Sequence, residues 1–142
     1  MDNKLTATTQ IKINAPVSKV WKAITDPAAI KQYLMGTNVT TDWKVGSPIT
    51  YTGEWKGKSY TDKGTIVNIV PEKLLHTTYL SGISGKEDKP ENYANVIYTL
   101  REHEDHTHVT LTQDNIETTD QLKHMEENWT TVLEGMKKVA EQ

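Results

Sequence analysis

Residues 118–142, TTDQLKHMEENWTTVLEGMKKVAEQ, decide the fold of this 142-residue chain. Their apolar side chains recur every three or four positions, which places them on one face of a helix. These side chains are Leu122, Met125, Trp129, Val132, Leu133, Met136, Val139 and Ala140. Thr118 and Gln121 have the spacing of a capping box, and Asp120 puts a negative charge where the helix dipole favours it. The sequence therefore predicts a long amphipathic helix whose apolar face needs a partner.

Most of the chain before this helix has the alternating pattern of half-buried strands. The predicted strands are 6–14, 36–43, 49–55, 59–70, 74–81, 93–102 and 107–116. Two short helices are predicted after the first strand, one from Pro16 to the Asp26-Pro27 stop and one over 28–33. A long helix that follows such strands must lie across their sheet, so we predict an α+β fold. How tightly the helix and the sheet close determines whether the protein has a solid core or a ligand cavity.

The composition restricts the classes of function. The chain has the length of one compact domain and no linker-like stretch, so we expect 1–142 to form a single domain. Neither a membrane span nor a secretory signal is recognisable, and we expect a cytoplasmic protein. The absence of cysteine excludes thiolate chemistry, and the formal net charge of -3 argues against nucleic acid as a partner.

Three stretches carry a resemblance to a known family: INAPVSKVWKAITDP (13–27), GTIVNIVPEKL (64–74) and NWTTVLEGMK (128–137). They resemble the bacterial family related to the activator of Hsp90 ATPase, within the START and Bet v 1-like (SRPBCC) superfamily. The resemblance implies a helix-grip fold, in which a curved antiparallel sheet of about seven strands wraps around the long C-terminal helix. It also implies a hydrophobic pocket between them. Tyr33 stands where the family usually has Trp, which is expected to change the pocket wall.

The aromatic and apolar residues expected on the inner faces form the candidate ligand site. They are Tyr33, Tyr51, Trp55, His76, Tyr98, Met125, Trp129, Leu133 and Met136. The same residues would also serve as an ordinary hydrophobic core. Because the chain contains no Phe, every aromatic ring carries an N–H or O–H group. A pocket lined by these rings would be amphipathic.

The orientation of His76 stays open at this point. It lies either beside the pocket, as a titratable group, or on the outer surface if Leu75 and Tyr79 point inward. Even an inward His76 would lack a charged partner to orient it, so we expect a ligand contact and no catalytic residue.

Other polar groups do not form a recognisable site. His103, His106 and His108 resemble metal ligands, but they fall at a predicted hairpin turn, where little supports a ligand's orientation, so we expect no metal site. The carboxylates Glu54, Asp62, Asp114 and Glu117 are interpreted as solvated surface groups. No nucleotide or nucleophile motif is present, and we expect no cofactor.

The favoured function is binding of a small hydrophobic molecule, of lipid, polyketide or aromatic type, between the C-terminal helix and the sheet. The family resemblance also implies a second function, a protein-interaction module that stimulates the ATPase of a chaperone partner. A third is a cyclase-like or hydrolase-like enzyme that uses the same pocket. We favour binding over catalysis because the sequence offers no well-placed acid or base.

Overall fold

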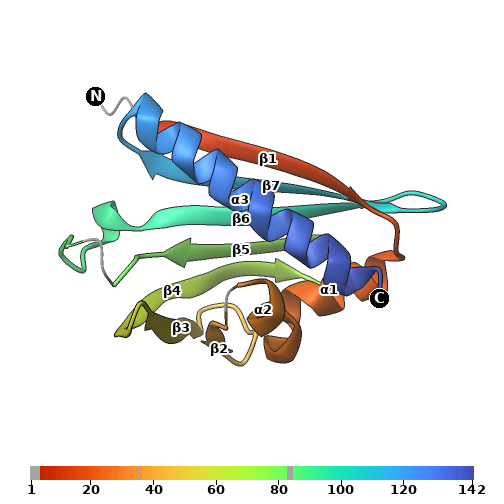
Figure 1. Cartoon of the computed structure of the whole chain (residues 1–142), viewed down its shortest axis with the longest axis horizontal. Helices are drawn as coiled ribbons and strands as arrows, with labels where there is room; N and C mark the ends of the chain where they lie inside the picture. Colours follow the sequence, from red (N-terminus) through yellow and green to blue (C-terminus); the bar gives the residue numbers. More distant parts are fainter. Residues whose placement is uncertain (1–3, 35, 83–84) are drawn as a thin grey trace.

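The computed structural model describes residues 4–34, 36–82 and 85–142, and only the backbone of Trp55. Within these residues, seven strands form one antiparallel sheet in the order β1-β7-β6-β5-β4-β3-β2. The strands are β1 (Leu5–Ile13), β2 (Asn38–Thr40), β3 (Pro48–Trp55), β4 (Lys58–Val70), β5 (Leu74–Tyr79), β6 (Ala94–Glu102) and β7 (Thr107–Ile116). The sheet curves around one long helix (Figure 1), so the predicted helix-grip fold is confirmed.

The helices occupy the predicted places in the chain. α1 (Val17–Thr25) and α2 (Pro27–Tyr33) follow β1, and α3 (Thr119–Ala140) closes the chain. The Asp26 carboxylate caps α2 by accepting a hydrogen bond from the N–H of Ala28 at 3.0 Å. A short 3-10 helix, η1 (Pro90–Asn92), was not predicted. In Figure 1, α3 runs across the sheet and α1 and α2 close one end.

The second strand is much shorter than predicted. We expected it over 36–43, whereas β2 covers only Asn38–Thr40. The backbone of Trp43 has a φ of 61°. This left-handed conformation is rare for a bulky residue and cannot continue a strand. The chain therefore leaves the sheet before Trp43 and turns back toward β3.

The start of α3 has the predicted cap, and its polar side chains cover the exposed edge of β1. The Thr118 hydroxyl accepts a hydrogen bond from the N–H of Gln121 at 3.1 Å. Farther along, the Glu141 carboxylate accepts one from the N–H of Asn14 at 2.7 Å. Lys137 donates to the carbonyl of Lys12 at 3.3 Å. An uncovered edge strand would offer these backbone groups to another chain.

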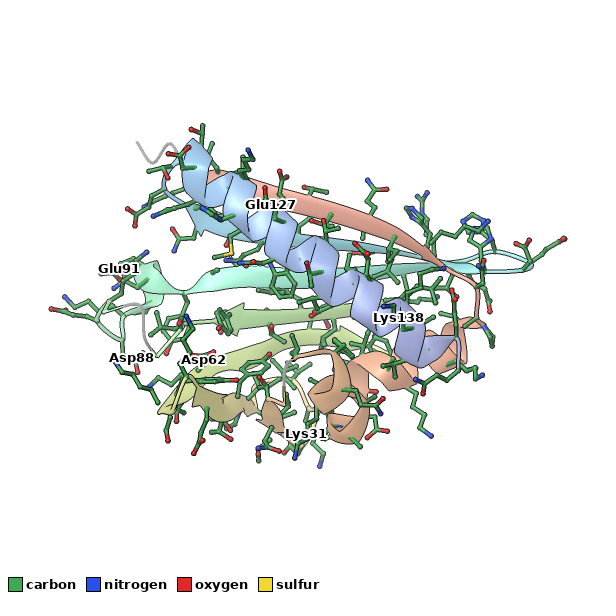
Figure 2. All side chains as sticks on the ribbon, in the orientation of Figure 1. Lys31, Asp62, Asp88, Glu91, Glu127 and Lys138 are labelled. Carbon is green, nitrogen blue, oxygen red and sulfur yellow. The ribbon has the colours of Figure 1, made fainter. Side chains whose placement is uncertain are left out.

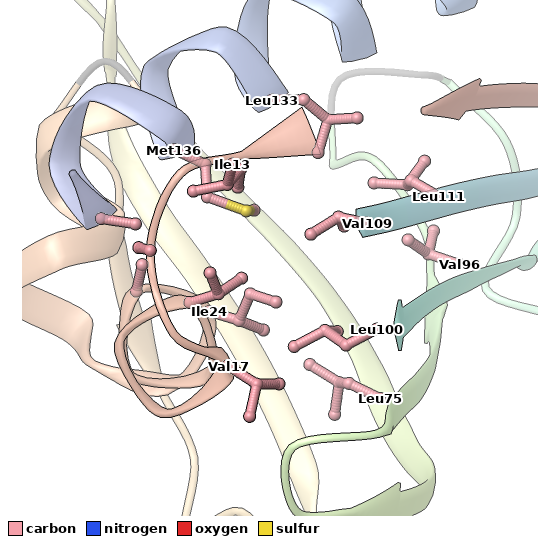
Figure 3. Close-up of a cluster of buried hydrophobic side chains, with 14 residues drawn as sticks. Ile13, Val17, Ile24, Leu75, Val96, Leu100, Val109, Leu111, Leu133 and Met136 are labelled. Atoms are coloured by element: carbon pink, nitrogen blue, oxygen red, sulfur yellow. The ribbon is translucent and has the colours of Figure 1, made fainter. Parts of the chain in front are cut away.

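The buried residues form two clusters, one large and one small. The large cluster lies between α1, α3 and the strands β5, β6, β7 and β1 (Figure 3). Its best-buried members from α3 are Leu133 and Met136, with 1% and 0% exposure. The smaller cluster contains Ile30, Val39, Ile49 and Ile66. Tyr33 and Trp43 pack against both clusters, so the space between the clusters is lined by aromatic rings.

Gly135 of α3 allows α2 to approach closely. A Cβ atom at position 135 would lie 2.8 Å from the Cβ atom of Tyr33, a distance that real side chains essentially never show. This contact fixes the position from which the Tyr33 ring reaches the space between the clusters. A glycine in mid-helix costs about 1 kcal/mol relative to alanine, and here the close packing offsets that cost.

We predict that Gly135→Ala lowers the free energy of unfolding by roughly 1 to 2 kcal/mol, although alanine is the better helix former. The clash with Tyr33 outweighs the gain in helix propensity. The measurement is urea unfolding followed by circular dichroism. Glu134→Ala, at the exposed neighbouring position, is the control and should change stability by less than about 0.5 kcal/mol. A Gly135→Ala protein more stable than the wild type would contradict the prediction.

Candidate functional site

A void of about 30 Å³ lies between the two hydrophobic clusters. Its walls come from α1, α2, β2, β3, β5, β6 and the loops near α2 and β2. The lining residues are Ile24, Ile30, Tyr33, Leu34, Val39, Trp43, Ile49, Tyr51, Leu75, Thr77 and Tyr98. This volume admits one or two water molecules, whereas sites for drug-sized ligands measure about 300–1,000 Å³. The void is therefore too small for a drug-sized ligand unless its walls move.

Three tyrosine hydroxyls give the void its polar character. The Tyr33 hydroxyl donates a hydrogen bond to the carbonyl of Ala23 in α1 at 2.8 Å. The Tyr51 hydroxyl is hydrogen-bonded to the side chain of Thr77. The Tyr98 hydroxyl has no hydrogen-bond partner among the described residues. It is not a buried atom without a partner, since among the described residues only the Oγ1 atom of Thr9 is one, so the Tyr98 hydroxyl reaches space that a water molecule can enter.

The tyrosines stay protonated at neutral pH. Burial raises the pKa of Tyr51 to about 12. Burial also raises the pKa of Tyr33 and of Tyr98, and the neighbouring Tyr51 hydroxyl raises both further. Neutral phenols can both donate and accept hydrogen bonds. The site is therefore amphipathic and carries no charge on its tyrosines, as the absence of Phe predicted.

Aromatic contacts extend from the void in two directions. Tyr51 packs edge to face against Tyr79, with ring centroids 5.7 Å apart. Tyr98 packs in the same manner against Trp129 of α3, at 6.4 Å. Edge-to-face pairs of this kind stabilise beyond their buried area. The inner face of the sheet thus carries connected aromatic rings on both sides of the void.

Asp62 was interpreted as a solvated surface group, and this interpretation is wrong. It is only 9% exposed and lies opposite Tyr51 on the inner face of the sheet. Its carboxylate accepts hydrogen bonds from the hydroxyl of Tyr79 at 2.6 Å and from the N–H of Gly82 at 2.8 Å. Figure 2 shows Asp62 on β4 beside the loop that follows β5. The alternation of β4 places Asp62 in phase with buried Ile66, a signal that the sequence contained.

The structure separates the predicted site residues into several groups. Tyr33, Tyr51 and Tyr98 line the void. Trp129 contacts the site through Tyr98, and Met125 is half-buried on the same helix. Leu133 and Met136 lie in the large cluster away from the void. The side chain of Trp55 lies outside the described residues.

His76 points away from the void. Its neighbours Leu75 and Thr77 both line the void, and successive side chains of a strand point to opposite faces. The Nε2 atom of His76 lies 2.8 Å from the Oδ1 atom of Asn95, whose amide nitrogen donates to Asp114 at 2.9 Å. The inward alternative for His76 is therefore wrong. An acid–base role at this void would need the other orientation.

The histidines of the β6–β7 hairpin lie at its exposed end. The rings of His103 and His106 stack with centroids 4.6 Å apart, and His106 lies 2.6 Å from the carboxylate of Asp105. In the part of the chain that the structure describes, no group of three or more His, Asp or Glu side chains is arranged to hold a metal ion.

The site predicted from the sequence contained only three of the eleven residues that line the void, Tyr33, Tyr51 and Tyr98. Ile24 and Ile30 come from the short helices, and Trp43 comes from the turn after β2. The apolar stripe of the first helix and the phase of Ile49 with Tyr51 were available signals. The position of Trp43 was not predictable, because it depends on the left-handed backbone at that residue.

Comparison with known proteins identifies the family of this chain. The model of the family described as "Activator of Hsp90 ATPase homolog 1-like protein" matches residues 14–141. The chain belongs to this family. A solution structure of ChR145 from Cytophaga hutchinsonii is 49% identical, covers 97% of this chain and 94% of that chain, and superposes with a TM-score of 0.86. No protein of curated function matches.

More distantly related solved structures share the fold. The Aha1 dimer from Colwellia psychrerythraea is 22% identical over 96% of each chain, with a TM-score of 0.75. CalU16 from Micromonospora echinospora is 20% identical, covers 98% of this chain and 87% of that chain, and has a TM-score of 0.69. At these identities the likeness shows the fold alone. No helix in the described residues has the length and apolar character needed to cross a bilayer.

We predict that stability falls at alkaline pH partly through Tyr51. An unfolded tyrosine loses its proton near pH 10, whereas buried Tyr51 does so near pH 12. Between these pH values the unfolded state is deprotonated first, so the free energy of unfolding decreases as the pH rises. The contribution of Tyr51 is roughly 2 to 3 kcal/mol. Urea unfolding at several pH values should show a shallower decrease for Tyr51→Phe, and equal slopes in both proteins would contradict this.

Proposed function

We propose that this protein binds a small, largely apolar molecule with a few polar groups, in an expanded form of the void between the sheet and the helices. The observation that carries the proposal is the Tyr98 hydroxyl, which bonds no other described residue and is accessible to water, at a void that two other tyrosines also line. A guest with a polar group could take the place of water at this hydroxyl. The tyrosine rings favour an aromatic or polyketide-like guest over an extended lipid chain.

The wall formed by β2 and the Trp43 turn is the part that we expect to move. β2 has three residues and pairs only with β3, and the backbone at Trp43 is left-handed. Short elements with few buried contacts open at low free-energy cost. By contrast, the β5 and β6 wall lies inside the sheet. A guest that buries about 200 Å² of apolar surface would contribute roughly 5 kcal/mol toward such an opening.

One structural relative is named for a locus that makes a small molecule. DynU16 is described as a protein in the dynemicin biosynthetic locus, and CalU16 has a similar designation. DynU16 is 16% identical to this chain, which covers 46% of DynU16. The likeness to these relatives shows only that the fold is shared. The choice of site in this chain depends on its own tyrosines.

The neutral fluorescent probe N-phenyl-1-naphthylamine tests the proposal, since its emission increases in an apolar site. We expect saturable binding by the wild type and at least about tenfold weaker binding by Tyr51→Ala, because the variant loses an aromatic wall. Tyr98→Phe should weaken binding by about two- to tenfold if the hydroxyl bonds the probe's amine.

Tyr93→Phe is the matched control, because the Tyr93 hydroxyl bonds the exposed Asp88 instead of facing the void. It should bind the probe like the wild type. Circular dichroism checks that each variant is folded. Absence of saturable binding by the wild type, or identical affinity in Tyr51→Ala, would count against this site.

The family match favours a second candidate function, stimulation of a chaperone ATPase in the cytoplasm. This activity would use the protein surface and would not need the void. Adding the purified protein to an Hsp90-type chaperone should then raise its rate of ATP hydrolysis, and Tyr51→Ala should stimulate as well as the wild type. An unchanged hydrolysis rate would argue against this candidate.

A further inference from the structure

The indole of Trp129 makes two specific contacts on the inner face of the sheet. Its N–H donates a hydrogen bond to the Oε1 atom of Gln113 at 2.8 Å. Its ring lies edge to face with Tyr98, with centroids 6.4 Å apart and an interplanar angle of 85°. Gln113 is only 7% exposed and lies opposite Val96 of β6. The indole therefore fills a position beside the void, separated from it by the Tyr98 ring.

We propose that the position of the Trp129 indole, which adjoins the void across the Tyr98 ring, becomes part of the expanded ligand site, and that the guest which displaces the indole is an aromatic ring bearing an N–H or O–H donor. This inference rests on the proposed function and names the class of ligand. When the indole leaves, the Gln113 carbonyl becomes a buried acceptor without a partner, which is unfavourable. A guest restores the lost bond only if it brings a donor. Its ring would take the edge-to-face position against Tyr98.

Trp129 differs from the rest of the apolar face of α3 in a way that permits displacement. Leu133 and Met136 are almost fully buried, whereas Trp129 is only half-buried. An indole at the border of the core can rotate toward solvent while the C-terminal half of α3 stays packed. The C-terminal half of α3 then keeps the protein folded while a guest replaces the indole.

A second polar group lies on the same inner face. The Oγ1 atom of Thr9 is buried and has no hydrogen-bond partner among the described residues. Thr9 pairs with Leu111, and the neighbouring pair is Ala7 with Gln113. Residues opposite one another in an antiparallel pair share a face. The inner face near Gln113 thus carries one acceptor in use, at Gln113, and one buried hydroxyl without a partner on the adjacent strand, at Thr9.

The test removes the indole side chain by mutation and adds free indole to the solution. Trp129→Ala should bind indole, and should bind its isostere benzofuran about two- to tenfold more weakly, because benzofuran has no donor for Gln113. Adding Gln113→Met to this variant should abolish the difference. Leu133→Ala, which opens a cavity elsewhere under α3, is the matched control and should not distinguish the two compounds. Affinities and the resonances of Gln113 and Tyr98 are followed by NMR.

The wild type provides the second readout. Binding of N-phenyl-1-naphthylamine, which carries an N–H group, should shift the Trp129 indole N–H resonance and speed its exchange with solvent. If Trp129→Ala does not fold, Trp129→Leu takes its place. Equal affinities for indole and benzofuran, or an unperturbed Trp129 resonance in the probe-bound wild type, would overturn the inference. The proposed function would stand in that case, because it depends on probe binding at Tyr51 and Tyr98.

Discussion

The packing of α3 against the curved sheet is the constraint on which the rest of the structure depends, and it is unequal along the helix. At the C-terminal half, Leu133, Met136 and Ala140 are at most 4% exposed and contact the core around α1. Nearer the N-terminus, Trp129 is only half-buried and is held by a ring contact and one hydrogen bond. The C-terminal half of α3 is therefore packed more tightly against the core than the turn that carries Trp129.

The less tightly packed part of α3, around Trp129, lies over the polar groups of the inner face of the sheet. Tyr98, Gln113 and Thr9 lie on neighbouring strands on the side that α3 covers, and the void adjoins Tyr98. Each polar group that is buried without a full set of partners reduces stability. The apolar side chains buried by the C-terminal half of α3 offset this loss of stability. Under the proposed function, stability comes from the C-terminal turns of α3, and the turn that carries Trp129 takes part in recognition.

The sequence predicted the fold well and the site in part, for physical reasons. The three-and-four spacing of α3 and the alternation of the strands are local signals, and they led to the helix-grip architecture. Strand alternation also led to Tyr51 and Tyr98. It left the face of His76 open because the pattern around it allowed two phases. Asp62 was misread because its charge was weighed above its phase with Ile66.

The volume of the void could not be predicted, because it depends on how side chains from six elements close around one point. Positive backbone φ at Trp43 and the close approach at Gly135 both shape that point, and both are properties of the folded chain. The result is a void of about 30 Å³ that holds no sizeable guest in this state. A binding function then requires that the free energy needed to open the void be smaller than the free energy gained when the guest is buried. Half-buried Trp129 and the three-residue β2 are the places where that cost is lowest, because few buried contacts must break there.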